Sequence, residues 1–237
     1  MRKQAGFTLI EIAIVLVIIG LLLGGVLKGQ ELITSARVRN LISQQDGVKA
    51  AYFGFLDRFR SLPGDYSLGT TNIANVTANG NANGQIEFAA AACAAPCQAA
   101  EYIVVWEHLS RAGFINGSYT YAPAPETPAS VPANPYVRYI QVIYDNAYGP
   151  DPAPVPAPAI RHNIKTGNQI PSDILAEIDR KVDDGNPIGG VFQFSIYNGG
   201  TGGTAPAGSA AGGCYSAVAP PNWVAPTVSN CGGASLL

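Results

Sequence analysis

A long apolar run near the N-terminus constrains this chain more than any other feature. From Phe7 to Leu27 almost every residue is apolar, and the run carries one charged side chain, Glu11. About 20 helical residues are enough to cross the hydrocarbon core of a bilayer. A lone carboxylate in hydrocarbon costs about 2.5–3.5 kcal/mol on insertion scales. The sequence therefore predicts a membrane-spanning helix in which Glu11 has an ionic partner.

The residues in front of this run form a short basic leader. Arg2 and Lys3 precede residues 6–11, which read Gly-Phe-Thr-Leu-Ile-Glu. These residues resemble the prepilin signal of type IV pilins and type II secretion pseudopilins. The resemblance implies that prepilin peptidase cleaves after Gly6 and methylates the new amine of Phe7, so that the apolar run stays in the mature protein. The alternative is an ordinary secretory signal or a simple membrane anchor, because an apolar stretch alone is common.

The resemblance also implies a role for Glu11 in assembly. In filaments of this family the corresponding glutamate meets the free amine of a neighbouring subunit, which here makes Glu11 and Phe7 an intersubunit pair. A buried ion pair adds little net stability compared with apolar packing, so we assign the pair to the register of assembly and the adhesion to the helix surfaces. The alternative is a carboxylate that reaches the lipid headgroups from near the end of the helix.

Glycines recur at helical spacing within and just after the apolar run. Gly20 and Gly24, and then Gly25 and Gly29, are each four positions apart. Small residues at this spacing let two membrane helices approach closely. Glycine is also frequent in membrane helices in general. The pattern therefore predicts either a helix-packing face or an ordinary membrane composition.

The rest of the chain predicts one globular head. The chain has 237 residues, 47% hydrophobic and 13% charged, which is enough for one modest core outside the membrane helix. Loss of Arg2 and Lys3 with the leader leaves 12 of 14 basic residues against 16 acidic ones, a formal net charge of -4 instead of -2. An acidic surface gives no broad attraction to nucleic acid. No nucleophile with a base, metal triad or phosphate loop emerges, so we expect neither enzymatic activity nor a nucleic-acid partner.

Four cysteines occur as two local pairs. Cys93 and Cys97 form the first pair, and Cys214 and Cys231 form the second. Four cysteines allow three connectivities. Because an exported protein favours disulfides, we expect each cysteine to bond to its nearer neighbour. The second pair resembles the C-terminal disulfide loop of many pilins.

The apolar periodicity predicts one long helix from residue 7 to about 62. Its first half is apolar all round, and its second half is amphipathic. A stripe at helical spacing is expected to face the head; it consists of Leu41, Val48, Tyr52, Phe55 and Phe59. Pro63 and Gly64 then stop the helix.

The head is expected to combine two further helices with a small antiparallel sheet. The predicted helices are residues 99–112 and 172–182, the second capped by Ser172. Alternating β-branched and aromatic residues predict strands; these are residues 136–144 and 191–197, with a third strand from either 118–121 or 160–164. The sheet is expected to pack on the long helix.

An asparagine-rich segment is a candidate metal site. Asn79, Asn81 and Asn83 place oxygen-bearing side chains at alternate positions, and Glu87 follows. This spacing matches the first eight positions of an EF-hand calcium loop. Every aspartate is replaced by asparagine, however, and Ala90 stands where the bidentate glutamate belongs. The pattern predicts either a weak calcium site at Asn79, Asn81, Asn83 and Glu87 or a solvent-exposed loop of Asx turns. No other cofactor is expected.

Acidic residues gather at the end of the second head helix. Asp179, Asp183 and Asp184 lie at or near its C-terminus, where the helix dipole disfavours anions. We expect them to recruit a cation. Arg180 and Lys181 on the same helix are the predicted partners, and a metal ion is the alternative.

Together these features predict an α+β, pilin-like fold. Its parts are a prepilin leader at 1–6, a long helix at 7–62 with its transmembrane segment at 7–27, and a globular head at 63–237 with proline- and glycine-rich loops and a disulfide loop. The half of the helix beyond the membrane is expected to pack against the small antiparallel sheet.

The resemblance implies a structural subunit of a type IV pilus-like extracellular filament. Its precursor is expected in the bacterial inner membrane as a single-pass protein. The expected partners are prepilin peptidase, the pilus or type II secretion assembly machinery, and other copies of the chain in a homo-oligomeric filament. The alternatives are a type II secretion pseudopilin, a low-copy minor pilin or adhesin, and a membrane-anchored binding protein.

Overall fold

The computed structural model of the chain describes most of its residues and groups them into two units. The described residues are 9–88, 100–123, 125–151, 157–200, 203–225 and 227–237. One unit ends at Arg39, and the other runs from Asn40 to Leu237. The predicted Cys93–Cys97 pair lies outside the described residues.

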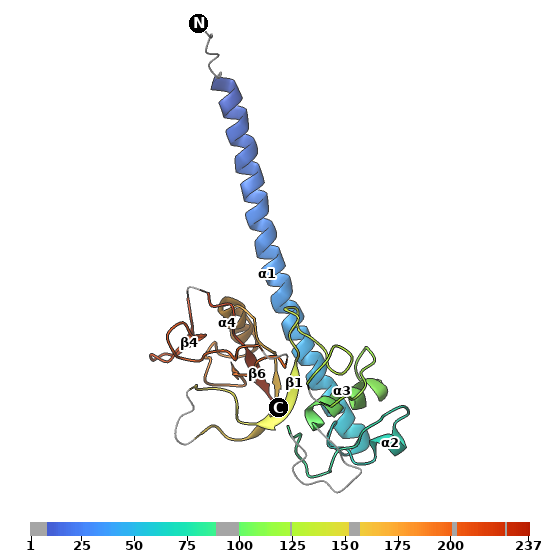
Figure 1. Ribbon diagram of the computed structural model, residues 1–237. Coiled ribbons are helices and arrows are strands. Elements are labelled where there is room, and N and C mark those ends of the chain that lie inside the picture. The colour runs from blue at the N-terminus through green and yellow to red at the C-terminus, as the bar shows by residue number, and fades with distance from the viewer. Residues whose placement is uncertain (1–8, 89–99, 124, 152–156, 201–202, 226) are drawn as a thin grey trace. The chain divides into compact units, whose positions relative to one another are not determined.

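The described residues form helices and short strands (Figure 1). The helices are α1 (Leu9–Phe59), α2 (Gly69–Asn72), α3 (Glu101–Arg111) and α4 (Ser172–Val182). The strands are β1 (Gln141–Asp145), β2 (Arg161–Lys165), β3 (Phe192–Phe194), β4 (Tyr215–Ser216), β5 (Asn222–Trp223) and β6 (Gly233–Leu236).

The turn that ends α1 requires glycine. Arg60, the residue after the helix, has a left-handed backbone with φ of 54°, and Pro63 cannot continue a helix. Gly64 follows with φ of 90°, and a Cβ atom built there would lie 2.7 Å from the carbonyl oxygen of Glu101. The chain therefore turns back close against α3, as the predicted stop at Pro63 and Gly64 requires.

The head contains a four-stranded antiparallel sheet. The strand order is β1-β2-β6-β3. In the register of β1 and β2, Gln141 lies opposite Lys165 and Asp145 lies opposite Arg161. The predicted third strand is found at β2, which overlaps the second of its two alternatives, residues 160–164. Strand β6, between β2 and β3, was not predicted.

The predicted strand at 136–144 is shorter in the structure because its first half forms a turn. The side-chain oxygen of Asn134 accepts hydrogen bonds from the backbone N–H groups of Tyr136, at 2.8 Å, and Arg138, at 3.0 Å. Between them Val137 has a left-handed backbone with φ of 59°. An asparagine side chain that bonds to the backbone two residues on competes with strand pairing, so β1 begins at Gln141.

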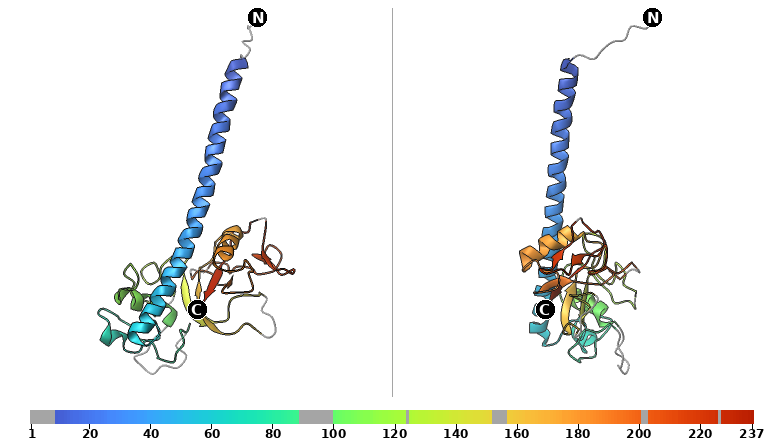
Figure 2. Two further views of the ribbon diagram at one scale, coloured as in Figure 1. Left: turned by 180° about the vertical axis from the view of Figure 1, so that it is seen from behind. Right: turned by 90° about the vertical axis from the view of Figure 1, so that its left-hand side faces the viewer.

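The second half of α1 packs against the sheet and α3, which confirms the predicted α+β arrangement. Its part within the second unit supplies buried Tyr52 and Phe55 to the main core. From the other elements this core includes Trp106, Leu109, Val142 and Ile164. In both views of Figure 2, α3 lies beside the last turns of α1. Of the predicted stripe, Phe59 is only partly buried.

Helix α4 is attached to the disulfide loop through Ser172. The hydroxyl of Ser172 donates to the carbonyl oxygen of Val224 at 2.9 Å and accepts from the backbone N–H of Val228 at 3.0 Å. Pro171 precedes the first turn, and no side chain caps it. The prediction that Ser172 caps this helix was therefore wrong, because its hydroxyl is already bonded to a loop far along the chain.

The disulfide between Cys214 and Cys231 closes that loop. Their Cα atoms are 5.6 Å apart, and 17 positions separate them in sequence. The loop contains the short pair β4 and β5. Both cysteines are fully buried, so the bond joins the core of the head to a segment with little regular structure.

Removal of this disulfide should destabilise the head. We expect the double variant Cys214→Ala/Cys231→Ala to lose about 3 kcal/mol of unfolding free energy, because a loop of roughly 15 residues is no longer closed in the unfolded chain. Guanidinium unfolding followed by tryptophan fluorescence measures this loss. The wild type with and without reductant is the control, and equal unfolding midpoints would contradict the prediction.

Candidate functional site

The first half of α1 exposes a continuous apolar surface. An 18-residue window of this helix is apolar enough to cross a membrane, and none of the window is buried within the described structure. Leu9 is 92% exposed and Leu21 is 73% exposed. Exposed apolar surface of this extent marks a site of contact with lipid or protein.

The predicted assembly residues lie at the start of this surface. Glu11 is in the first turn of α1. Gly6 and Phe7 lie outside the described residues, so their cleavage and the pairing of Phe7 with Glu11 remain predictions.

Two carboxylates of α3 hold the backbone of the asparagine-rich segment. The carboxylate of Glu101, 1% exposed, accepts from the backbone N–H of Asn81 at 2.9 Å and from that of Glu87 at 3.1 Å. The carboxylate of Glu107 accepts from the N–H of Thr77 at 3.0 Å and from its hydroxyl at 2.9 Å. These contacts fix a long loop by bonds between charged acceptors and main-chain donors, which are stronger than neutral ones.

His108, on the same helix, holds the segment at two further points. Its Nδ1 accepts from the backbone N–H of Gly64 at 3.0 Å, and its Nε2 lies 3.0 Å from the carbonyl oxygen of Ala78. These partners assign the proton to Nε2. Burial lowers the pKa of His108, so the ring is neutral. It stacks on Phe55 of α1 with ring centroids 5.9 Å apart, and its role is structural.

The structure brings together three of the four predicted calcium ligands. The side-chain amides of Asn81 and Asn83 donate to one carboxylate oxygen of Glu87, at 3.1 and 2.9 Å. Asn79 is engaged elsewhere: its side-chain oxygen accepts from the backbone N–H of Thr70 at 2.8 Å, and its amide donates to the Thr70 hydroxyl at 3.0 Å. Asx turns also form at Asn81 and Asn83.

A third carboxylate contacts this loop from the turn after α1. Asp65 accepts from the backbone N–H groups of Asn83, at 3.0 Å, and Gly84, at 2.9 Å. Burial raises the pKa of Glu101 from 4.5 to about 7, hydrogen bonds from backbone N–H groups oppose this rise, and the charges of Asp65 and Glu87 add to it. Burial raises the pKa of Asp65 as well. Glu101 and Asp65 therefore favour proton uptake in the folded state.

Glu101 should make the stability of the head depend on pH. A carboxyl group whose pKa is raised on folding stabilises the fold below its unfolded pKa, and this contribution is lost as pH rises through the folded value. Relative to Glu101→Gln, the wild type should therefore lose stability as pH rises from 4.5 to about 7. Thermal unfolding at several pH values in chelator measures the difference. The exposed substitution Glu31→Gln is the control, and parallel profiles for wild type and Glu101→Gln would contradict the prediction.

Calcium at this loop remains a prediction, and it has a direct test. A ligand that binds only the folded chain raises its melting temperature. We expect calcium at about 1 mM, the range of weak extracellular sites, to raise the melting temperature of the wild type and not that of Glu87→Ala. Magnesium at the same concentration is the control. Equal melting temperatures with and without calcium would leave the loop of Asx turns as the correct interpretation.

The acids at the end of α4 are bonded to protein N–H groups. Asp179 is fully buried and accepts from the indole N–H of Trp223 at 2.7 Å and from the backbone N–H of Gly185 at 3.3 Å. Asp183 accepts from two backbone N–H groups at the start of β3. Within the described parts of the chain, Lys181 pairs with Glu177, so the predicted pairing of these acids with the helix's own cations was wrong. Backbone N–H groups of the segment that follows α4 bond to Asp179 and Asp183 in place of these cations.

A metal ion at these acids remains a prediction. Ligand oxygens of Asp179, Asp183 and Asp184 lie within 4.8 Å of one another. Burial raises the pKa of Asp179 to about 6, and the hydrogen bond from Trp223 opposes this rise. The buried carboxylate thus already has strong donors.

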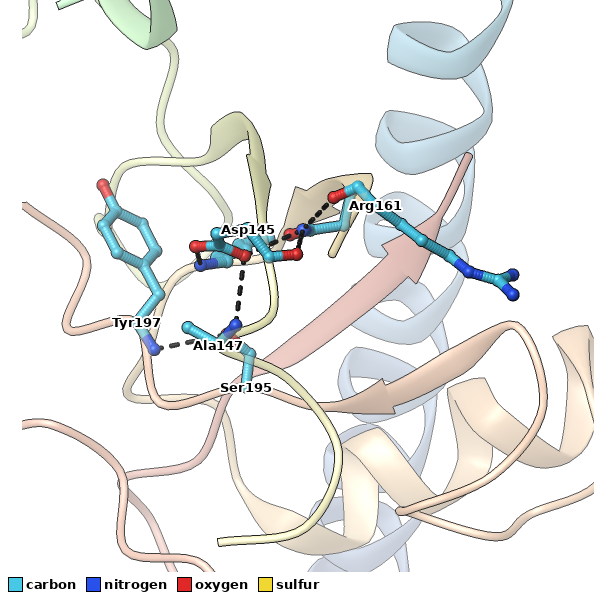
Figure 3. Close-up of polar contacts among 7 residues, drawn as sticks. Asp145, Ala147, Arg161, Ser195 and Tyr197 are labelled. Atoms are coloured by element: carbon cyan, nitrogen blue, oxygen red, sulfur yellow. Dashed lines mark hydrogen bonds and ion pairs between the residues drawn. The ribbon is translucent and has the colours of Figure 1, made fainter. Parts of the chain in front are cut away.

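A buried ion pair on the sheet was not predicted from the sequence. The ammonium of Lys165, 2% exposed, bonds to the carboxylate of Asp145 on the neighbouring strand. Asp145 also accepts from the side-chain amide of Asn163 at 2.9 Å and from the backbone N–H of Ala147 at 3.2 Å (Figure 3). Burial lowers the pKa of Lys165, and the Asp145 charge limits that shift.

The only sequence signal for this pair is the alternation of residues in the second strand. Arg161, Asn163 and Lys165 alternate with His162 and Ile164, which places the polar residues on one face. Asn163 and Lys165 are buried and Arg161 is exposed; the burial follows from pairing with β1, which a local pattern does not reveal.

Comparison with known proteins identifies the N-terminal segment. A family model described as the prokaryotic N-terminal methylation motif matches residues 1–27. This motif is the prepilin signal of type IV pilins and pseudopilins, and the resemblance seen in residues 6–11 is confirmed. No curated protein and no solved structure matches the chain. The chain therefore carries a prepilin signal joined to a head whose role these comparisons do not address.

Proposed function

We propose that this chain is the structural subunit of a type IV pilus-like extracellular filament. Its precursor is anchored in the bacterial inner membrane by α1, prepilin peptidase cuts it after Gly6, and the assembly machinery stacks it into a homo-oligomeric filament. The observation that carries the proposal is the prepilin motif at residues 1–27, which leads into a helix whose apolar window has no cover in the described chain.

The length of α1 supports this proposal. The helix has 51 residues, which at 1.5 Å per residue makes it about 75 Å long. A membrane crossing needs about 20 residues. The buried residues of α1 begin at Val38, so the apolar turns before it are available to other copies of the chain.

The glycines of α1 support close packing between copies. A Cβ atom added at Gly20, Gly24, Gly25 or Gly29 would meet nothing within 4 Å, so none of the residues that the structure describes requires glycine there. Glycine costs about 1 kcal/mol relative to alanine inside a helix. Contact with a neighbouring helix at these positions would explain why the chain bears that cost.

Glu11 supports a directed mode of assembly. The first turn of α1 carries this one acidic residue, in a segment otherwise suited to lipid or to apolar packing. A carboxylate in such surroundings requires a partner. In the proposed filament the methylated amine of Phe7 on a neighbouring subunit neutralises it, which sets the axial register of the helices.

Replacement of Glu11 tests the filament function. Glu11→Gln keeps the size of the side chain and removes its charge, which leaves the neighbouring amine without a partner. We expect processing to remain intact and the amount of subunit in sheared filaments to fall by about tenfold or more, because an uncompensated buried charge costs several kcal/mol. Mass spectrometry of the mature N-terminus and immunoblots of sheared and cell fractions measure the two steps.

Two further variants separate cleavage from assembly. Glu31→Gln changes another glutamate of α1, one that pairs with Lys28 at 2.7 Å, and should form filaments as the wild type does. Gly6→Leu should retain the leader and stop the chain in the membrane. Normal fibres from Glu11→Gln would refute the ion-pair role of Glu11. The filament proposal itself fails if the secreted form begins downstream of Leu27.

A further inference from the structure

A mixed polar and aromatic pocket opens on one face of the sheet. It has a volume of about 490 Å³, within the usual range of small-molecule sites. Gln141 and Asp145 of β1 and Lys165 of β2 form its floor. Residues 141 and 145 share a face because successive strand residues alternate, and Lys165 lies directly opposite Gln141.

The polar floor holds unused hydrogen-bonding capacity. The ammonium of Lys165 has three donors, and Asp145 is the one hydrogen-bond partner that the described residues offer it. Gln141 is 2% exposed, yet its side-chain amide bonds to none of the described residues. Both side chains are buried and face the same pocket, so a ligand there would meet donors and an acceptor that the protein itself leaves unused.

The asparagine-rich loop supplies an acceptor to one wall of the pocket. The backbone N–H of Tyr144 donates to the carbonyl oxygen of Ile86 at 2.8 Å, which fixes the loop beside β1. Glu87 follows and lines the pocket. Asn81 and Asn83 bond to its Oε2, while its Oε1 has no bond to the part of the chain that the structure describes.

Aromatic rings border the polar floor. Phe88 is 63% exposed and stacks one face on Tyr102, with centroids 4.9 Å apart and planes at 3°, so its other face is open. Tyr197 lies across the pocket, and its hydroxyl donates to Glu126 at 3.1 Å; Figure 3 shows its ring on the same side of the strands as Asp145. An exposed aromatic ring fixed by stacking is a flat apolar surface for a ligand.

The polar floor of the pocket has no net charge, because Lys165 and Asp145 neutralise each other. Glu87 on the wall repels an anion, so the floor favours a neutral ligand over an anionic one. The remaining groups are a spare ammonium donor, a neutral amide and a carboxylate oxygen beside open ring faces. A neutral sugar ring matches this set, because its hydroxyls both donate and accept while its C–H face packs on an aromatic ring. We propose that this pocket binds a neutral saccharide residue of a glycan.

Glycan binding would be a function of the head that is separate from filament assembly. The residues that line the pocket belong to the second unit, Asn40–Leu237, whereas Glu11 and the glycines of the apolar segment belong to the first. The two proposals can therefore fail independently.

The test uses the full mature chain, purified in detergent, on an array of immobilised glycans. The array carries oligosaccharides that end in glucose, galactose, mannose, N-acetylglucosamine or N-acetylgalactosamine, together with sialylated and sulfated counterparts. We expect binding to at least one neutral terminal sugar. Calorimetric titration with the methyl glycoside of that sugar then gives the affinity in solution.

Two pocket variants and two matched controls assign the binding to this pocket. Gln141→Leu removes the amide, and Phe88→Ala removes the open ring; each should weaken binding by about tenfold, the effect of one lost hydrogen bond or ring contact. Gln193→Leu on β3 and Phe53→Ala, an aromatic residue that is 48% exposed on α1, lie outside the pocket and should bind as the wild type does.

The melting temperature of each variant is measured alongside. If Gln141→Leu does not fold, Phe88→Ala decides. The proposal is overturned if no neutral glycan binds, if the sialylated or sulfated glycans alone bind, or if folded pocket variants bind with unchanged affinity.

Discussion

The apolar surface of the first half of α1 is the constraint on which the rest of the molecule depends. None of its apolar window is buried within the described structure, and water cannot solvate such a surface cheaply. Before assembly, lipid can cover it; in the proposed filament, copies of the same helix cover it. The carboxylate of Glu11 is affected most by the change from lipid to filament, because the hydrocarbon core of a bilayer offers it no counterion. In this proposal Glu11 favours the filament over the membrane-embedded precursor.

In the head, side chains of α3 fix a long segment that has little regular secondary structure. Between α1 and α3 the chain forms just the four-residue helix α2 among the described residues. Glu101, Glu107 and His108 reach out from α3 and bond to backbone groups of that segment. The helix therefore works as a rigid support, and the raised pKa of its buried Glu101 predicts that the stability of the head depends on pH. A cation at the loop would oppose the same proton uptake.

Local sequence signals predicted the helices and the prepilin signal, and they failed where distant segments meet. Periodicity was enough for α1, α3 and α4, because each buries one stripe. Strand β6 reads Gly-Ala-Ser-Leu, which has no strand pattern. The neighbouring strand explains why a small residue is needed: a Cβ atom at Gly233 would lie 2.3 Å from the ring of Phe192. The position of Lys165 opposite Gln141 likewise depends on the pairing of β1 with β2, which no local pattern encodes.

The position of β6 has a consequence for the order of events during synthesis. This strand, Gly233–Leu236, pairs with β2 on one side and β3 on the other. The sheet cannot close until these residues have left the ribosome, because β6 lies between β2 and β3. In the proposed precursor, the apolar half of α1 has entered the membrane by then. In the proposed precursor, the head therefore stays incomplete beyond the membrane, with β2 and β3 not yet joined, and in this state it is open to chaperones and proteases.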